Sequence, residues 1–486
     1  MRTVQHYPGM ARMGLIPAAA LLVLASAACG DSPQAGTPTL PDGTETIPAR
    51  TVALPTRTPA AAIAPPGTLD RTFGDGGIVA TDLDGRSDEV HAVIVQPDGK
   101  IVVAGETYVF PQDRPRFALA RYNADGSLDA TFGDSGHIIT GMTDDEWDAS
   151  VPHALALQPD GKLLVAGTSY SPDDEHNVFA LARFEADGTP DKTFGNQGRV
   201  LTAIDTSERA MDDVAYALAV DADGKIVLAG ATGAFPTDFA AARYLPNGKL
   251  DTTFGDRGKV VTDLGGSDAA AAISIQPDGK IVLAGRGVEN EDDWAMLRYM
   301  PNGKLDTAFG KGGKLSLDFN GGEDLATGLA IRPDGKIVVG GTTYVGAVIC
   351  KDENGLTRGC DKYSSALAQY TPGGVPDKAF GEGGKVVYDF DMLSGANALV
   401  LQPNGKVVLA GHYDGDDFAV IRANPDGTLD GTFGEAGLVR TPFGRSYDVA
   451  YALALQPDGK IVAAGTGTLD DNPLNGDFAL TRYHGR

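Results

Sequence analysis

The chain has 486 residues, of which 42% are hydrophobic, and its 64 glycines, 29 prolines and few aromatic residues indicate many turns and short elements. Its 65 acidic and 40 basic residues give a formal net charge of -25, and no basic cluster interrupts the acidic excess. Such a surface repels phosphate backbones, which excludes nucleic acid as a partner, and we expect the acidity to serve solubility outside the cytoplasm.

Residues 1–28 are predicted to be a signal peptide. Arg2 and Arg12 are the charges of this segment, and the apolar run GLIPAAALLVLASAAC follows. A basic start, a short apolar run and small residues at its end are typical of secretion signals. The run is too short to span a bilayer comfortably, and no other stretch approaches that length, so no transmembrane helix is expected.

The signal ends at Cys29, and SAAC resembles the lipobox of bacterial lipoproteins, in which a small residue precedes a cysteine that becomes diacylated. Ser26 departs from this pattern, which prefers Leu, so cleavage after Ala27 is an alternative. Residues 29–64, rich in Pro, Thr and Ala without periodicity, are predicted to be a disordered tether. We therefore expect lipidation of Cys29 and a place in the cell envelope, in the outer membrane or periplasm; secretion is the alternative.

One unit recurs seven times between residues 65 and 486. QPDGKIVVAG at 96–105 returns as QPDGKLLVAG at 158–167, QPDGKIVLAG at 276–285 and QPDGKIVAAG at 456–465. Each unit continues through a variable loop, a segment such as FALARYN, a second Gly turn, SLDATFGDSG and HIIT. Apolar runs bounded by Asp-Gly and Asn-Gly turns are hairpin signals and give four strands per unit. The sequence thus predicts an all-β, seven-bladed β-propeller, in which Gly105 begins the departure into a loop.

The two ends of the chain are predicted to share one blade. The last unit stops at DFALTRYHGR, where a turn and an LDxTFG segment are due. That segment lies instead at residues 65–83, PPGTLDRTFGDGGIVATDL. We expect the N-terminal strand to complete the last blade as its outer edge, which removes the exposed edge of an open array.

Three residue types recur at fixed offsets and are interpreted as scaffold. We expect the acids and arginines to form ion pairs or capped turns and the phenylalanines to pack between blades; an anion-binding arginine ring is the less favoured alternative. The acids are Asp70, Asp129, Asp191, Asp251, Asp306, Asp377 and Asp430, the FALARY position holds Arg121, Arg183, Arg243, Arg298, Gln369, Arg422 and Arg482, and the phenylalanines are Phe73, Phe132, Phe194, Phe254, Phe309, Phe380 and Phe433.

A further polar set precedes the first strand of each unit. Since first strands line the channel of a propeller, these residues predict either caps of their own turns, which we favour, or an acidic ring that binds calcium or another divalent cation. The set is Asp88, Ser150, Asp213, Asp268, Asp324, Ser394 and Asp448.

His91 and His153 share one position beside that set and are candidate metal ligands together with its carboxylates. The other units carry Tyr216, Ala271, Thr327, Asn397 and Tyr451 there, so drift at a tolerant position is the alternative.

The variable connections, between second and third strands and between units, are expected on one rim, where function sits on a rigid scaffold. Asp144, Asp145, Glu146 and Trp147 form the candidate binding rim, whereas Trp294 takes the place of a recurrent Phe and is expected in the core.

Cys350 and Cys360 lie in an insert that the other units lack. In an exported chain we expect them to form a disulfide, and free or metal-bound thiols are the alternative.

The pattern LDxTFGxxGxVxTDL, ALQPDGKIVVAG and FALARYxxDG resembles the delta-60 repeat family of bacterial propeller-like proteins over residues 65–486. The resemblance implies exported or surface proteins, largely without assigned activity, and supplies no catalytic residues.

We therefore expect a monomeric, non-catalytic binding or scaffolding module for a protein or glycan of the cell envelope, which touches the membrane through its anchor alone. The alternative is a divalent-cation-dependent hydrolase or lactonase-like enzyme with its site at the channel mouth.

Overall fold

The computed structural model describes residues 64–83, 87–109, 114–145, 148–205, 212–233, 236–287, 293–319, 321–351, 357–390, 394–413, 417–444, 448–467 and 476–486, the side chains of 349–360 and 394 excepted. These residues contain 28 strands and no helix. Accordingly, the described part of the chain holds no helical segment with the length and hydrophobicity of a membrane span.

The strands occupy four positions that repeat around the molecule. The innermost are β2 (Asp88–Val95), β6 (Ser150–Leu157), β10 (Val214–Val220), β14 (Ala269–Ile275), β18 (Asp324–Ile331), β22 (Ser394–Leu401) and β26 (Val449–Leu455). The second are β3 (Ile101–Val109), β7 (Leu163–Ser171), β11 (Ile226–Thr232), β15 (Ile281–Gly287), β19 (Ile337–Lys351), β23 (Val407–Tyr413) and β27 (Ile461–Gly467). The third are β4 (Arg114–Tyr122), β8 (His176–Phe184), β12 (Asp238–Tyr244), β16 (Asp293–Tyr299), β20 (Thr357–Tyr370), β24 (Asp417–Ala423) and β28 (Asp477–Tyr483). The outermost are β5 (His137–Thr140), β9 (Arg199–Thr202), β13 (Lys259–Thr262), β17 (Lys314–Leu317), β21 (Lys385–Tyr388), β25 (Leu438–Thr441) and β1 (Ile78–Thr81).

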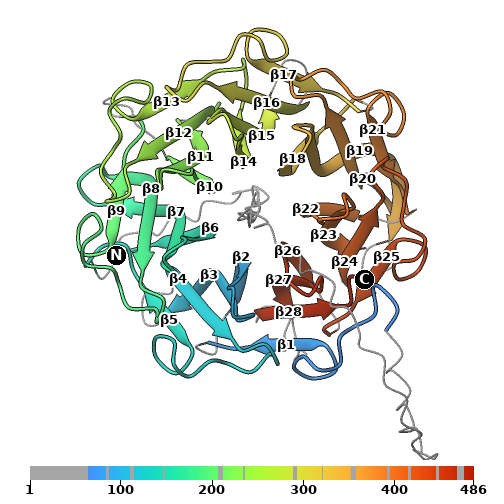
Figure 1. Cartoon of the computed structure of the whole chain (residues 1–486), viewed down its shortest axis with the longest axis horizontal. Coiled ribbons are helices and arrows are strands. Elements are labelled where there is room, and N and C mark those ends of the chain that lie inside the picture. Colours follow the sequence, from blue (N-terminus) through green and yellow to red (C-terminus); the bar gives the residue numbers. More distant parts are fainter. Residues whose placement is uncertain are drawn as a thin grey trace, which may run out of the picture.

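These strands form seven four-stranded antiparallel sheets, which stand as blades around a central channel (Figure 1). We number the blades 1 to 7 in chain order, from β2–β5 to β26–β28 with β1. The predicted seven-bladed propeller is confirmed. The β3 strand continues to Val109, so the expectation that Gly105 begins a loop is wrong.

Blade 7 is closed by the two ends of the propeller, as predicted. Strand β1 pairs with β28 in antiparallel register from Ile78 opposite Thr481 to Thr81 opposite Phe478. Beyond the strand, the Gly67 N–H donates to the carbonyl of His484 at 2.7 Å. The outer edge of the last sheet is thus supplied by the beginning of the chain (Figure 1).

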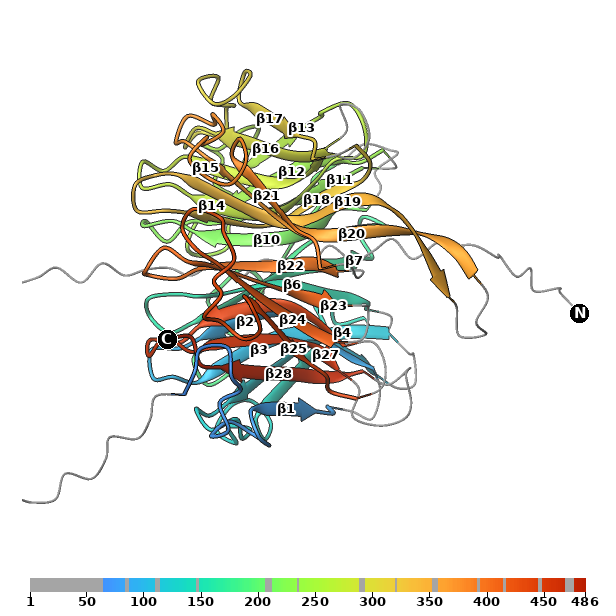
Figure 2. The ribbon, with the colours of Figure 1, turned by 90° about the vertical axis from the view of Figure 1, so that its right-hand side faces the viewer.

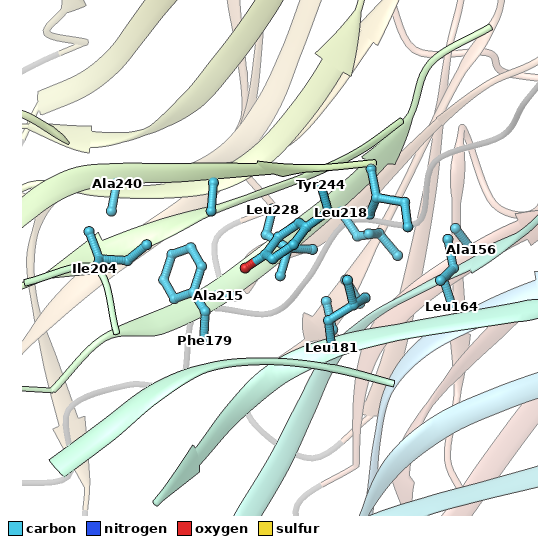
Figure 3. Packing of buried hydrophobic residues seen from close by; sticks show 14 of the residues in the cluster. Ala156, Leu164, Phe179, Leu181, Ile204, Ala215, Leu218, Leu228, Ala240 and Tyr244 are labelled. Carbon is cyan, nitrogen blue, oxygen red and sulfur yellow. The ribbon is translucent and has the colours of Figure 1, made fainter. Parts of the chain in front are cut away.

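The hydrophobic core lies between the blades, because each sheet packs its two faces against its neighbours. Seven buried clusters each combine residues of two adjacent blades, and each contains one of the seven recurrent phenylalanines. Figure 3 shows the cluster between blades 2 and 3, where Phe179 and Leu181 of β8 face Leu218, Leu228 and Tyr244. The predictions for the phenylalanines are confirmed, and Trp294 is buried in the cluster between blades 4 and 5.

The recurrent arginines join each blade to the next. In blade 1, Arg121 Nε donates to Asp129 Oδ2 at 2.7 Å, and Arg121 NH1 donates to the carbonyl of Ala186 in blade 2. Lys100 Nζ lies 2.7 Å from the same carboxylate oxygen, and the guanidinium carbon lies 4.6 Å from the ring centroid of Phe132. We call this group of Arg, Lys, Asp and Phe the blade joint.

The joint repeats around the ring and closes it. The corresponding NH1 atoms of Arg183, Arg243, Arg298, Arg422 and Arg482 donate to the carbonyls of Pro246, Pro301, Pro372, Gly485 and Ala124. The Arg482 bond runs from blade 7 to blade 1. The predicted ion pairs are confirmed, and the arginines also bind the neighbouring blade.

In blade 5, the arginine of the joint and the glutamine of the QPDGK segment have changed places. Gln369 stands where the other blades have arginine, and Arg332 stands where most have the Gln of QPDGK. Arg332 Nε donates to Gln369 Oε1 at 2.6 Å and NH1 to the carbonyl of Gly405 in blade 6 at 2.6 Å. Gln369 in turn donates to Asp377 at 2.7 Å. The guanidinium has moved to the other strand, and the contact to the next blade persists.

The ring has two unlike faces. The connections between first and second strands are tight turns of five residues, and those between third and fourth strands are segments of 14 residues that recur with the same length. We call their side the turn face. The connections between second and third strands and between blades lie on the opposite side, the loop face, from which the β19–β20 hairpin projects (Figure 2). The prediction that the variable connections share one face is confirmed.

Asp129→Asn should destabilise the fold, because it leaves two cations of the joint without their carboxylate. Burial opposes the ionisation of Asp129, but hydrogen bonds from Lys100 and Thr131 outweigh it and hold the pKa of this carboxyl below its ordinary value. The ionised Asp129 carboxylate therefore contributes to the free energy of unfolding above about pH 4, and this contribution is lost as pH falls through the folded-state pKa. Denaturant unfolding at pH 7 should show a loss of roughly 3–5 kcal/mol.

The matched control is Asp256→Asn on the same face, whose side chain is 89% exposed and whose removal should change stability by less than about 0.5 kcal/mol. Unchanged stability of Asp129→Asn at pH 7 would contradict the role assigned to the joint.

The exchange in blade 5 predicts strong coupling between its two positions. Arg332→Gln removes the contact to blade 6, and Gln369→Arg places two guanidinium groups together, so each single change should be destabilising. The double variant restores the arrangement of the other blades and should be more stable than the sum of the single effects predicts, by roughly 1–3 kcal/mol. A double-mutant cycle on urea midpoints measures this coupling; additive effects would contradict it.

Candidate functional site

Every innermost strand pair carries a β-bulge at the same place. The register between the first and second strands shifts by one residue in all seven blades, for example between Val90 and Ala92. A bulge re-aims the side chain of its extra residue, so one side chain per blade is set apart from the regular alternation. The seven bulge residues are His91, His153, Tyr216, Ala271, Thr327, Asn397 and Tyr451.

The bulge explains the last glycine of QPDGKIVVAG. A Cβ on Gly105 would lie 1.9 Å from the carbonyl oxygen of Glu89 on the facing strand. The bulge brings the two backbones together at this point, so a side chain larger than hydrogen is excluded. The same clash occurs at the corresponding glycine of every blade.

Four bulge residues form an aromatic arc along the inside of blades 7, 1, 2 and 3. The ring centroids of His91 and His153 are 5.6 Å apart, Tyr451 lies 5.8 Å from His91, and Tyr216 lies 5.2 Å from His153. Both histidines are almost fully buried, and burial lowers their pKa values. The arc is therefore uncharged at neutral pH.

The other bulge residues serve the scaffold. Thr327 Oγ1 donates to the carbonyl of Ala396 at 2.8 Å, and Asn397 Nδ2 donates to that of Ala450 at 3.1 Å. Ala271 is buried. Hydrogen bonds between neighbouring blades thus continue at the channel.

The predicted channel carboxylates hold loops. All five aspartates of the set are buried, and each accepts a hydrogen bond from a backbone N–H of the connection before it. The pairs are Asp88 with Leu83 (2.7 Å), Asp213 with Ile204 (2.6 Å), Asp268 with Leu264 (2.6 Å), Asp324 with Phe319 (3.0 Å) and Asp448 with Phe443 (2.7 Å). Each therefore fastens the connection that arrives from the preceding blade. Burial raises the pKa of Asp88 to about 7 and that of Asp213 to about 6. Cation binding by this set stays a prediction.

In blade 2 the carboxylate that holds the preceding connection comes from a different position in the chain. It carries Ser150 in place of Asp, and Asp148 supplies the carboxylate instead. Asp148 accepts a hydrogen bond from the Met142 N–H at 2.8 Å and pairs with Arg116 at 2.5 Å. The loop is held even where the repeat pattern fails.

Three groups among the described residues bring potential metal ligands within 4.8 Å of one another. Two contain a predicted carboxylate: Asp238, Asp263 and Asp268 form one, and Asp293, Asp318 and Asp324 form the other. The third joins His91 to Glu89 and Glu106 rather than to Asp88 or His153.

Glu89 and Glu106 are not among the site residues predicted from the sequence. Both lie at positions where the other six units carry no carboxylate. They could have been found by aligning the seven units and looking for residues that occur in one unit alone.

Two residues of the candidate rim line a groove of 420 Å³ on the outer side of blades 1 and 2. Asp144 and Asp145 meet Ser171, Asp173 and Arg199 there. Arg199 NH1 lies 3.0 Å from Asp144 Oδ1, and Asp144 is fully exposed. Glu146 and Trp147 lie outside the described residues.

The insert of blade 5 forms the long β19–β20 hairpin, which runs in register from Ile337 opposite Tyr370 to Lys351 opposite Thr357. Cys350 is opposite Arg358 and Cys360 is opposite Val348, so the two cysteines are diagonal neighbours. Their side chains lie outside the description, as does Cys29, and the disulfide and the lipidation stay predictions.

Comparisons with known proteins agree with the fold. Residues 96–132, 158–194, 222–254, 276–309, 332–350, 402–433 and 456–483 match the model of a family described as a domain of unknown function (DUF5122), beta-propeller. No curated protein matches the chain.

Several solved structures are similar to the chain at low sequence identity. A virginiamycin B lyase from Staphylococcus aureus is 9% identical with a TM-score of 0.39, and the match covers 83% of this chain and 98% of the lyase. A gluconolactonase from Xanthomonas campestris is 12% identical (TM-score 0.31; 66% and 90%), and Drosophila Semaphorin 1a is 9% identical (TM-score 0.40; 84% and 88%). At these values the likeness carries no statement about activity. The chain is thus similar, in seven repeated segments, to a propeller family without assigned function.

Proposed function

We propose that the protein is an exported, lipid-anchored binding module that contacts a protein or glycan of the cell envelope through its loop face. One observation carries this proposal: the polar residues that recur in every unit serve the blade joints and the loop fastenings. Two features that belong to single units, the β19–β20 hairpin and the groove at Asp144 and Asp145, lie on the loop face or its flank.

Two such features favour a macromolecular partner. The β19–β20 hairpin extends the surface well beyond the ring (Figure 2). The groove at Asp144 and Asp145 offers exposed carboxylates beside a half-buried arginine. A projecting arm and a polar groove on a rigid support suit a large surface with several contact points.

The proposed anchor rests on the sequence of the first 29 residues. A lipid on Cys29 would hold the propeller at a membrane through the segment up to residue 64, and export agrees with the acidic composition.

A hydrolase or lactonase-like enzyme that depends on a divalent cation is the second candidate. The observation in its favour is the set of three ligand groups described above, one of which lies on the hairpin of strands β2 and β3. Hydrolysis that a chelator stops and calcium restores would support it.

Trimming the hairpin tests the binding module. Tyr344 and Tyr363 are opposite each other, with ring centroids 5.9 Å apart, so Asn-Gly in place of residues 345–362 should give a hairpin of ordinary length. We expect the trimmed protein, or Asp144→Ala with Asp145→Ala, to recover roughly ten-fold less of the cross-linked partner from native envelopes.

The control for this experiment is Arg257→Ala, an exposed residue of the turn face, which should recover as much partner as the unmodified protein. Full recovery by both loop-face variants would place the contact elsewhere.

Cys29→Ala tests the anchor. Diacylation requires the thiol, and two acyl chains are needed for stable attachment, so the variant should move from the membrane fraction to the soluble fraction. Cys350→Ala is the matched control and should stay with the membranes. Continued sedimentation of Cys29→Ala with membranes would defeat the lipid model.

A further inference from the structure

Blade 1 places two carboxylates opposite each other where no other blade does. Glu89 of β2 is the register partner of Glu106 of β3. The corresponding pairs in blades 2 to 7 are Val151 with Thr168, Val214 with Ala231, Ala269 with Arg286, Leu325 with Thr342, Gly395 with His412, and Val449 with Thr466. Like charges in direct opposition on a sheet are destabilising, so this pair calls for a compensating interaction.

The scaffold does not require an acid at this position. Thr168 and Thr466, which correspond to Glu106, donate hydrogen bonds to backbone carbonyls of the next blade, at Asp213 (2.9 Å) and Asp88 (3.3 Å). A carboxylate cannot donate in this way when ionised. Glu106 therefore places a buried acidic group at a position where Thr168 and Thr466 form a contact between blades.

The pair is also poorly solvated. Glu106 is 7% exposed, and Glu89 is half-buried with an Oε1 atom that is inaccessible to solvent and lacks a hydrogen-bond partner among the described residues. Burial, together with the charge of Glu89, raises the pKa of Glu106 to about 8. In the absence of a cation, a proton must offset part of this charge at neutral pH.

A histidine completes the group. His91 is 1% exposed, its Nε2 has no hydrogen-bond partner among the described residues, and the β-bulge removes it from the regular alternation of β2. Its ring nitrogen and the two carboxylates offer ligand atoms that all lie within 4.8 Å of one another. A buried imidazole nitrogen without a partner is normally satisfied by a hydrogen bond or a metal.

We propose that Glu89, His91 and Glu106 form a binding site for one divalent transition-metal ion on the innermost hairpin of blade 1. One imidazole and two carboxylates suit Zn²⁺ or Mn²⁺ better than Ca²⁺, which prefers six to eight oxygen ligands. Three protein ligands leave at least one coordination position open. Glu89, the most exposed of the three, provides the side from which an ion enters. The site stands independently of the loop-face binding function.

The probe is Zn²⁺ added to the chelator-treated full-length chain with its three cysteines replaced (Cys29→Ala, Cys350→Ser, Cys360→Ser), so that no thiol contributes. Calorimetry and elemental analysis should find one tightly held Zn²⁺ per chain. Glu106→Gln should weaken its binding by about 100-fold or more, since loss of even an indirect partner of a metal ligand costs 10- to 100-fold. Asp238→Asn, in the acidic group at the junction of blades 3 and 4, should leave the affinity unchanged.

The histidines give a second, matched pair of variants. Blades 3 and 7 carry tyrosine at the bulge, so tyrosine is compatible with this position. His91→Tyr should lose Zn²⁺, whereas His153→Tyr should retain it. Absence of stoichiometric Zn²⁺, or binding that survives both Glu106→Gln and His91→Tyr, would overturn the proposal.

Stability without metal separates loss of binding from misfolding. In the metal-free protein, Glu89 and Glu106 are opposed on the sheet and poorly solvated, which is an unfavourable arrangement. Metal-free Glu106→Gln should therefore melt at a higher temperature than the unmodified protein at pH 9. A lower melting temperature would show that the carboxylate stabilises the fold by itself and would count against the metal site.

Discussion

The contact of one guanidinium group with the next blade is the interaction on which the ring depends. Among the described residues no strand pairing connects one sheet to another, so the seven sheets are held by side chains and by backbone hydrogen bonds between their connections. Hydrophobic packing between blades is strong but non-directional. The arginine adds direction, because one planar group binds its own carboxylate, stacks near a phenylalanine and reaches a carbonyl of the neighbour. The angle between successive blades, and hence the closure after seven, is constrained at this point.

The fold was predictable because the information that specifies it is repeated. Turn glycines, apolar runs and the displaced segment at residues 65–83 each pointed to four-stranded units in a closed ring. Two features were not predictable from recurrence: the exchange of Arg332 and Gln369, and the use of Asp148 for the carboxylate that is missing at Ser150. In both cases a chemical group is kept while its position in the chain changes. Only register and distance show that such residues are equivalent.

The candidate sites show the same limit more strongly. Sequence comparison identified His91, but its neighbours Glu89 and Glu106 are 17 residues apart in the chain and meet only through the register of β2 with β3. The acids at Asp88 and its equivalents were noticed because they recur, and they are largely occupied by backbone N–H groups. In this chain, polar residues that recur in every unit therefore stabilise the scaffold. Residues that occur in a single unit indicate the places where the chemistry differs. The bulge makes such departures tolerable, since its backbone geometry is the same whether it carries His, Tyr, Ala, Thr or Asn.

The closure of blade 7 also determines the face at which the chain enters the ring. The segment before β1 enters the ring on the turn face, where Gly67 is bound to His484 and Pro66 accepts a hydrogen bond from Gly434. The hairpin β19–β20 projects from the opposite side, away from the C-terminus (Figure 2). If residues 29–64 act as the proposed tether and the hairpin as the proposed contact arm, the two would belong to opposite faces of the disc and give the protein a polarity. Held at a surface by residues 29–64, the propeller would turn its regular face toward that surface and its irregular face toward whatever approaches.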